Sequence, residues 1–215
     1  MQSSLFGQDI CEKITLEDGE LWWFPNWLSP READCYFECL RKEVSWQQSH
    51  IRIAGKTLPV PRLNAWYGEK TIGYEYSGIA LSPQPFTATL NTLKSKMTET
   101  FQRASSTSAP QQTFSCNSAL INLYRDGNDS VAWHADDEPE LGIHPQIASV
   151  SLGASRRFLL KPQNASTRVV ELLLTPGSLL FMRGELQHDW LHSIPKTKTS
   201  VGSRINITFR QVYSS

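Results

Sequence analysis

The chain has 215 residues, with 21 lysines and arginines against 21 aspartates and glutamates, so its formal net charge is zero. This length is most simply one domain, and a hydrophobic share of 40% can fill a core. Overall charge does not steer such a chain to nucleic acid, although a local basic patch can. Without a secretory signal or an apolar stretch of ~20 residues, we expect a cytoplasmic protein (nucleoid-associated if bacterial), monomeric by default and without a membrane partner.

The N-terminal part predicts one helix behind a polar arm. Residues 1–20 are polar and are expected to be loosely attached. Ser29 can cap a helix, Pro30 suits the first helical position, and Glu32 completes a capping box. Apolar residues at every fourth position behind this start predict a helix over residues 29–46.

The next part of the chain predicts a hairpin and a second helix. Residues 51–60 have two extended arms on either side of Gly55, which is typical of a β-hairpin. Tyr74 and Tyr76 follow a turn-rich stretch and would share a face in an extended chain. Apolar residues at helical spacing predict a helix over residues 86–101.

The second half is strand-like. Many short strands separated by turn residues are typical of a double-sheet jelly roll, and the two earlier helices would cover one outer face of it. The short apolar run 21–24 is a further strand or a packed arm. The predicted strands of the second half cover residues 120–124, 147–152, 157–161, 169–174, 178–182 and 204–210.

A histidine and a carboxylate two residues apart suggest a metal site. His134 and Asp136 would share one face of a strand. Two histidines and one carboxylate form the facial triad of non-haem Fe(II) oxygenases. His188 and His192 are both candidates for the distant third ligand, and the place of His192 just before an arginine-containing strand favours it. A hydrolytic zinc site is the alternative metal site, and an ordinary surface pair is the alternative without metal.

The strand over residues 204–210 alternates polar and apolar side chains. Arg204, Asn206, Thr208 and Arg210 face one way with a period of two. Guanidinium groups inside a barrel require anions, and their forked geometry matches carboxylates. A dicarboxylic acid bound to both the metal and an arginine fits this pattern. A solvated edge strand is the alternative, although Asn122 and Tyr124 form a second polar pair at the same spacing.

Five segments together resemble the AlkB family of Fe(II)/2-oxoglutarate-dependent dioxygenases, most closely its nucleic-acid-repair members. They occur in order over about residues 50–212, so the resemblance covers most of the chain. The segments are PRLNAWYG (61–68), NLYR (122–125), DSVAWHADDE (129–138), IASVSLGASR (147–156) and RINITFR (204–210).

The resemblance implies an α+β, mainly β fold, a double-stranded β-helix of the jelly-roll type. Residues 1–215 would be one domain, with an arm and helix in 1–48, a nucleotide-recognition lid in 49–85 and a helix plus the catalytic jelly roll in 86–215. It implies Fe(II) with 2-oxoglutarate and O2 as co-substrates, and makes His134, Asp136 and His192 the iron ligands, with Arg210 also catalytic. The residues implied to bind 2-oxoglutarate are Asn122, Tyr124, Arg204, Thr208 and Arg210.

By the same resemblance, two regions would contact the substrate. Tyr74 and Tyr76 would lie over the target base, and Asp137 and Glu138 would contact the base and its nucleotide. The hairpin tip, residues Ile53, Ala54 and Gly55, would probe the nucleic acid. Duplex-preferring members have an aromatic wedge where this chain has Ala54, and alanine offsets little of the cost of unstacking a base. We therefore expect a preference for single strands.

The implied activity is repair of alkylated DNA, and by extension RNA, by oxidative demethylation of bases such as 1-methyladenine and 3-methylcytosine. The products are formaldehyde, succinate and CO2. The alternatives are the same chemistry on a substrate other than nucleic acid, an inactive nucleic-acid binding module, and a zinc hydrolase. Candidate contacts to the nucleic-acid backbone are Arg52, Lys56, Arg62, Arg125, Arg156 and Lys161.

Overall fold

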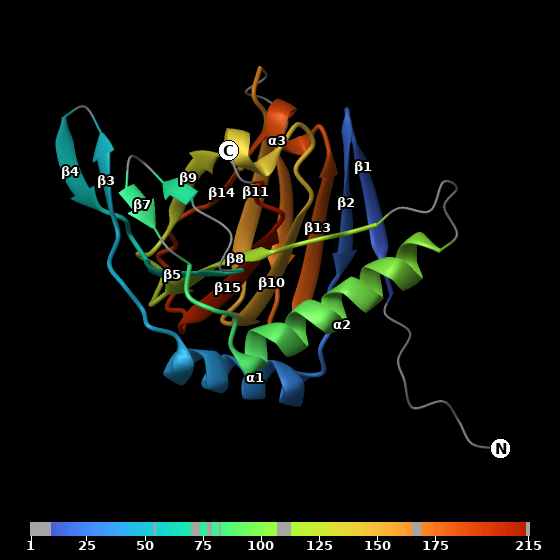
Figure 1. Cartoon of the computed structure of the whole chain (residues 1–215), viewed down its shortest axis with the longest axis horizontal. Helices are drawn as coiled ribbons and strands as arrows, with labels where there is room; N and C mark the ends of the chain where they lie inside the picture. Colours follow the sequence, from blue (N-terminus) through green and yellow to red (C-terminus); the bar gives the residue numbers. More distant parts are fainter. Residues whose placement is uncertain are drawn as a thin grey trace.

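Two antiparallel sheets form the body of the protein in the computed structural model, which describes residues 10–53, 55–69, 74–76, 79–81, 83–106, 113–164 and 169–213 (Figure 1). The larger sheet has the strand order β1 (Glu12–Leu16), β2 (Gly19–Phe24), β13 (Ser178–Gly184), β10 (Ile147–Gly153), β15 (Arg204–Arg210), β8 (Ser118–Tyr124) and β5 (Leu63–Gly68). The smaller has the order β12 (Val170–Leu174), β11 (Arg156–Pro162), β14 (Trp190–Ile194) and β9 (Val131–His134). The predicted jelly roll is confirmed.

Two helices cover the outer face of the larger sheet. Both α1 (Pro30–Glu43) and α2 (Ala88–Ser105) contribute buried apolar side chains to one core with β8, β10, β13 and β15. The capping box is confirmed, because the Ser29 amide donates to Glu32 Oε2 at 2.9 Å and the Glu32 amide donates to Ser29 Oγ at 3.3 Å. Among the described residues, no helix combines the length and apolar character needed to cross a membrane.

The expectation of a loosely attached N-terminal arm is wrong for β1. This strand pairs with β2, and β2 pairs with β13, so the N-terminal strands extend the larger sheet. Because β1 is the edge strand, most of its side chains are exposed or half-buried. An edge strand of this kind has the polar composition that suggested a loose arm. Residues 1–9 lie outside the described structure.

Two small hairpins flank β5 in the chain, one before it and one after it. The predicted turn at Gly55 is confirmed, since it joins β3 (His50–Ile53) to β4 (Lys56–Pro59) with a φ of 77° that favours glycine. The second hairpin pairs β6 (Tyr74–Tyr76) with β7 (Ile79–Leu81). Ala54 lies outside the described residues, and Ile53, Tyr74 and Tyr76 are described only as members of these paired strands.

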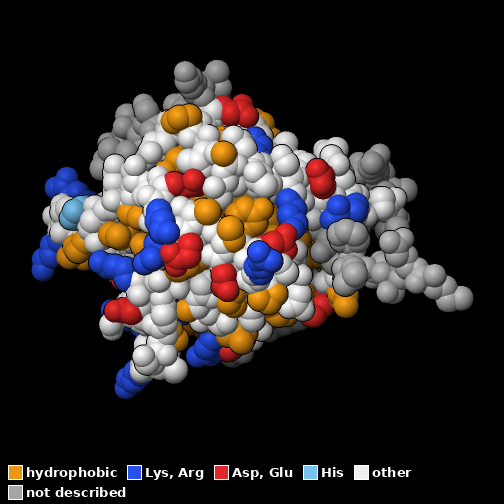
Figure 2. Space-filling model, turned by 90° about the horizontal axis from the view of Figure 1, so that it is seen from below, with side chains coloured by type: hydrophobic (Ala, Val, Ile, Leu, Met, Phe, Trp, Pro, Cys, Tyr) orange, Lys and Arg blue, Asp and Glu red, His pale blue; other side chains and the backbone are white. Residues whose placement is uncertain are grey.

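The helix-bearing face has no single sign of charge. Figure 2 shows acidic, basic and apolar side chains interspersed on it, which agrees with the zero net charge of the chain. Basic side chains gather at the end of the molecule that carries the β3–β4 hairpin (Figure 2). Arg52 and Lys56 of this hairpin are both exposed. A local basic surface therefore exists beside an otherwise mixed one.

Candidate active site

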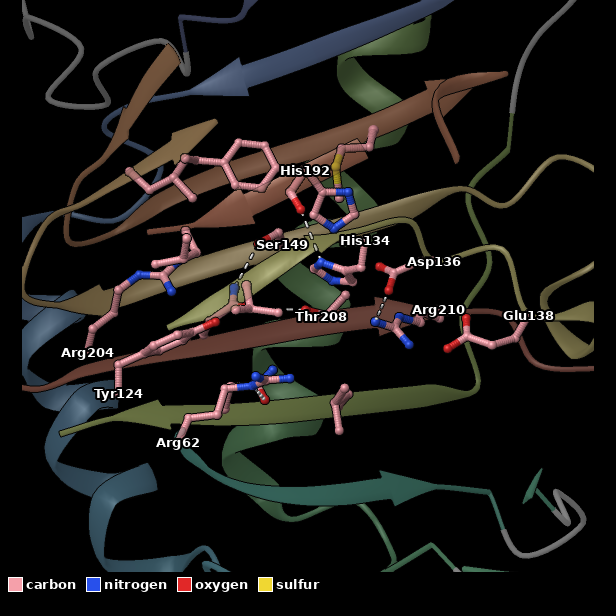
Figure 3. A pocket seen from close by; sticks show the side chains of 18 residues that line it. Arg62, Tyr124, His134, Asp136, Glu138, Ser149, His192, Arg204, Thr208 and Arg210 are labelled. Carbon is pink, nitrogen blue, oxygen red and sulfur yellow. Dashed lines mark hydrogen bonds and ion pairs between the residues drawn. The ribbon is translucent and has the colours of Figure 1, made fainter. Parts of the chain in front are cut away.

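The two facing sheets bring together the predicted metal ligands. His134 is the final residue of β9 and is paired with His192 of β14, while Asp136 lies two residues beyond β9. One donor atom from each of the three side chains lies within 4.8 Å of the other two. Figure 3 shows the three side chains pointing toward one another. His188, the competing candidate, lies on the short helix α3 (Leu186–Asp189) and belongs to a different cluster.

Hydrogen bonds and burial leave both histidine rings in a form that can bind a metal. His134 Nδ1 lies 2.9 Å from the Ala132 carbonyl oxygen and 3.1 Å from that of His192. Since a carbonyl only accepts, Nδ1 donates, and the lone pair of the neutral ring is on Nε2. Burial, together with the nearby His134, lowers the pKa of His192 to about 3, so this ring is neutral at physiological pH.

The carboxylate ligand is held from two sides. Asp136 is buried, and its Oδ1 accepts from Arg210 Nη2 at 2.7 Å. Its backbone amide donates to Gln187 Oε1 at 2.9 Å, which links the ligand to α3. Burial alone would raise the pKa of Asp136, but the charge of Arg210 and the nearby histidines lower it below its usual value. The group is therefore a carboxylate with a fixed position.

Arg204 is the candidate for the anion clamp that the sequence predicted. The side chain is 1% exposed, and Nη2 donates to Ser151 Oγ at 2.9 Å. Its Nε and Nη1 atoms are buried and make no hydrogen bond within the described part of the chain. The guanidinium carbon lies 5.1 Å from the centre of the Tyr124 ring. Buried guanidinium donors without a partner are suited to an anionic carboxylate.

The polar face of β15 lines a pocket between the sheets, so the alternative of a solvated edge strand is wrong. Strand β15 lies between β10 and β8, and its apolar residues pack into the core. Asn206 Nδ2 donates to Ser149 Oγ at 2.7 Å, and Thr208 Oγ1 lies 3.2 Å from Asn206 Oδ1. Asn122 accepts from Arg62 Nε at 2.9 Å. The polar side chains of the lining therefore form two hydrogen-bonded groups.

The pocket has two chemically different ends. Figure 3 shows Arg204 and Tyr124 at one end, Glu138 at the other, and the metal ligands between them. Both ends belong to the same pocket lining. Glu138 has a buried Oε2 atom with no hydrogen-bond partner among the described residues, whereas Asp137 is exposed and lies outside the lining. The structure thus separates the two predicted substrate carboxylates.

A second cavity, of about 230 Å³, adjoins this pocket. The two share Arg62, Leu120 and Arg210 in their linings. The second cavity adds an apolar wall with Trp66 and several amide and hydroxyl groups. Its polar residues are Gln47, Ser49, Asn64, Gln84 and Ser118.

The sequence missed several residues of the site. Arg62 lines both cavities, although its segment suggested only a backbone contact, and Gln187 carried no local signal.

Conversely, Arg156 is 3% exposed and donates to the carbonyl oxygens of Asp126, Asp129 and Pro195. It therefore tethers loops inside the protein and is not available to a phosphate. Arg125 is engaged by Asp129 through two side-chain hydrogen bonds.

The donor set fits a divalent iron, and the unsatisfied guanidinium fits a dicarboxylate co-substrate. Residues 20–210 match the 2OG-Fe(II) oxygenase superfamily. The chain belongs to this superfamily. Relatives with the AlkB name place it within the AlkB family, as the sequence motifs predicted. His134, Asp136 and His192 form the two-histidine, one-carboxylate ligand set of non-haem Fe(II) oxygenases.

Several relatives are similar over most of this chain. It is 44% identical over 199 residues to alkB homolog 3 of Mus musculus, covering 88% of this chain and 65% of that protein. For the Homo sapiens homolog 3 the identity is 42%, with the same coverage. The DNA oxidative demethylase ALKBH2 of Homo sapiens is 36% identical over 191 residues, covering 84% of this chain and 69% of that protein. The chain thus spans about two thirds of the length of these relatives.

Two solved structures share the fold of this AlkB-family chain. OsALKBH1 aligns with a TM-score of 0.66 at 18% identity, covering 92% of this chain and 100% of that one. A prolyl hydroxylase from Trichoplax adhaerens, in complex with a peptide fragment, aligns with a TM-score of 0.58 at 14% identity, covering 89% and 83%. At these identities the likeness shows the jelly-roll fold alone.

Proposed function

We propose that this protein repairs DNA by oxidative demethylation of N-alkylated bases such as 1-methyladenine and 3-methylcytosine, with RNA as a second substrate. The observation that carries the proposal is the order of groups along one pocket. An anion clamp at Arg204, three metal ligands and an unsatisfied carboxylate at Glu138 follow one another (Figure 3). Relatives named as DNA oxidative demethylases support the same substrate class.

His134, Asp136 and His192 would hold Fe(II) in this proposal. With 2-oxoglutarate and O2, Fe(II) supplies the oxidising power that hydroxylates an N-methyl carbon, after which formaldehyde leaves and succinate and CO2 remain. The chain itself fixes the ligands. The Ala132 and His192 carbonyls set the tautomer of His134, and Arg210 with Gln187 orients the Asp136 carboxylate.

Arg204 would bind the remote carboxylate of 2-oxoglutarate through its guanidinium, whose Nε and Nη1 atoms have no partner in the described structure. Each charge-assisted hydrogen bond contributes about 1.5–3 kcal/mol. Tyr124, Asn122 and Thr208 line the same pocket and would contact the rest of the molecule. The clamp thereby sets which end of the dicarboxylate reaches the metal.

Glu138 would provide the counter-charge for the damaged base. Methylation at the Watson–Crick edge makes adenine or cytosine cationic, and a carboxylate with a buried, unsatisfied oxygen is suited to such a cation. Tyr74 and Tyr76 are proposed to lie over the base. The neighbouring cavity, with Trp66 and its amide groups, offers stacking and hydrogen bonds to the same nucleotide.

We propose a preference for single strands. Support comes from the sequence, since alanine at position 54 offers no aromatic wedge to replace a flipped base. Arg52 and Lys56 are exposed on the hairpin and would contact phosphates. We also propose a monomeric enzyme, because elements of a single chain supply the ligand, clamp and carboxylate groups of the site. We propose a cytoplasmic location on the sequence alone.

Formaldehyde release from a 3-methylcytosine oligonucleotide, with Fe(II), 2-oxoglutarate and ascorbate, tests the proposal. We expect release by the wild type that depends on 2-oxoglutarate and is lost in His134→Ala. Glu138→Gln should reduce release more than its exposed neighbour Asp137→Asn. Single-stranded and duplex oligonucleotides compared side by side test the strand preference. Succinate without formaldehyde would refute the substrate, and no succinate would refute the oxygenase assignment.

A further inference from the structure

A second cluster of two histidines and one carboxylate lies outside the active site. His144, Glu185 and His188 each place one donor atom within 4.8 Å of the other two. His144 Nδ1 lies 2.8 Å from Glu185 Oε1, and the two histidine ring centres are 6.2 Å apart. The side chains of His144 and Glu185 are 60% and 38% exposed, so an ion could reach them from solvent. None of the three lines the active-site pocket.

Backbone geometry holds two of these side chains together. The His188 amide donates to the Glu185 carbonyl at 2.9 Å, and this hydrogen bond closes the turn of α3. The two residues are three positions apart in the sequence. Residues at this spacing lie on one face of a helix. Two features hold this turn in place. The Glu185 amide donates to the Asp18 carbonyl at 2.7 Å, and Leu186 is buried. The backbone that carries Glu185 and His188 is therefore held in one position.

The third side chain of the cluster, His144, comes from a neighbouring loop. His188 Nε2 donates to the carbonyl of Ile143, the residue before His144. This hydrogen bond leaves the lone pair of the neutral His188 ring on Nδ1, as is usual for a histidine that binds a metal. The loop is held at its other side, where the Tyr213 amide donates to the Glu140 carbonyl at 2.8 Å. Both halves of the cluster are thus positioned by backbone contacts.

We propose that His144, Glu185 and His188 form a second metal site, which binds Zn²⁺. Two imidazoles and one carboxylate suit zinc, whereas magnesium and calcium prefer oxygen ligands. Solvent supplies the fourth ligand, because the cluster is open. The ion connects the loop that follows Glu138 to α3, whose Gln187 holds the amide of Asp136. It is a structural clip, separate from the iron ligands.

Zinc stoichiometry tests this site without any activity measurement. Tag-free protein, stripped of metal with a chelator, is titrated with ZnCl₂ against a colorimetric zinc indicator. We expect two equivalents for the wild type, one in the buried triad and one in the surface cluster. His188→Ala and His144→Ala should each bind one equivalent, and so should His134→Ala. The double variant His134→Ala/His188→Ala should bind none.

His50→Ala is the matched control, because His50 is an exposed histidine on β3 outside both clusters, and it should keep two equivalents. Zinc should also raise the melting temperature of His134→Ala but not of the double variant, since an ion that binds only the folded state stabilises it. The proposal is overturned if His188→Ala and His144→Ala retain two equivalents. It is equally overturned if the wild type binds one equivalent that His134→Ala loses.

Discussion

The protein contains two clusters of two histidines and one carboxylate, which differ in their burial and in the groups that surround them. In the first, Asp136 and His192 are 4% and 6% exposed between two sheets. In the second, His144 and Glu185 have side chains that are 60% and 38% exposed on a loop and a short helix. The same donor set therefore leads to different chemistry, because the surroundings decide what else can bind.

The difference is clearest in the groups next to each cluster. The buried triad has Arg204 with two unsatisfied donors at one end of its pocket and Glu138 at the other. Charged groups act strongly there because the surrounding dielectric constant is low. The surface cluster faces solvent, which screens charge and leaves no enclosed space for an organic co-substrate. A buried triad can support catalysis, whereas an exposed one is suited to holding a loop.

Removing one histidine from each cluster should give the largest contrast. We expect His192→Ala to reduce iron affinity and formaldehyde release by more than about 100-fold, since even loss of an outer partner of a ligand costs 10–100-fold. His188→Ala should leave both within about twofold, because it contacts neither the pocket nor the triad. Iron content and product yield measure the two effects. Equal losses in both variants would remove the distinction between the clusters.

The clamp should matter for the co-substrate and not for folding. We expect Arg204→Met to raise the KM for 2-oxoglutarate by about 100-fold, because two charge-assisted hydrogen bonds are lost. Its free energy of unfolding should be unchanged or higher by about 1 kcal/mol, since a buried charge without a carboxylate partner is removed. Arg157→Met, on the exposed Arg157–Glu171 pair, is the control and should alter neither. Lower stability with an unchanged KM would assign Arg204 to the fold.

Gln187 lies between the two clusters and should affect only the buried one. Gln187→Met keeps the length of the side chain but removes the acceptor for the Asp136 amide. We expect iron affinity to fall 10–100-fold and stability to fall by about 1–3 kcal/mol, because the amide is left buried without a partner. Zinc binding at the surface cluster should persist, as seen by titration in a His134→Ala background. Unchanged iron affinity would argue against positioning of Asp136 through α3.

The smallest expected effect lies far from both clusters. Hydrogen bonds from Lys96, and then from Ser29, lower the pKa of Glu32 to about 2 from its ordinary value of 4.5. The carboxylate therefore contributes stability that is present above pH 4.5 and is lost as the pH falls toward 2. We expect Glu32→Gln to cost less than about 1 kcal/mol at pH 7, because the side chain is partly exposed. Urea unfolding should show a smaller difference at pH 3 and unchanged metal binding at pH 7.

The parts that sequence predicted have local signals. The capping box before α1 consists of residues three positions apart, and the alternation along β15 repeats every two residues. Each pattern determines which face is buried before any tertiary contact is known. The candidate ligands His134 and Asp136 were also predictable, because a spacing of two residues places both side chains on one side of an extended chain. These features needed no knowledge of neighbouring strands.

The parts that sequence missed or only favoured depend on tertiary pairing. His188 and His192 lie four residues apart, and the pairing of β14 with β9 brings His192, which the sequence favoured, beside His134. Arg156 and Arg52 look alike in sequence, yet one is buried against carbonyl oxygens and the other is exposed on a hairpin. Strand β1 is polar because it is an edge, and Gln187 acts through a contact 51 residues away in the chain. Local patterns cannot encode such partners.

The central position of β15 has a consequence for how the protein is made. Strands β10 and β8 flank it, and both are synthesised long before it. Until residue 210 has left the ribosome, the growing chain presents two strands with open edges and a core that lacks Ile205, Ile207 and Phe209. The larger sheet can thus close only after synthesis of β15, and those open edges must be kept apart in the meantime. Because Arg204 belongs to this same strand, a chain truncated before it lacks both the centre of the sheet and the guanidinium that is proposed to bind the co-substrate.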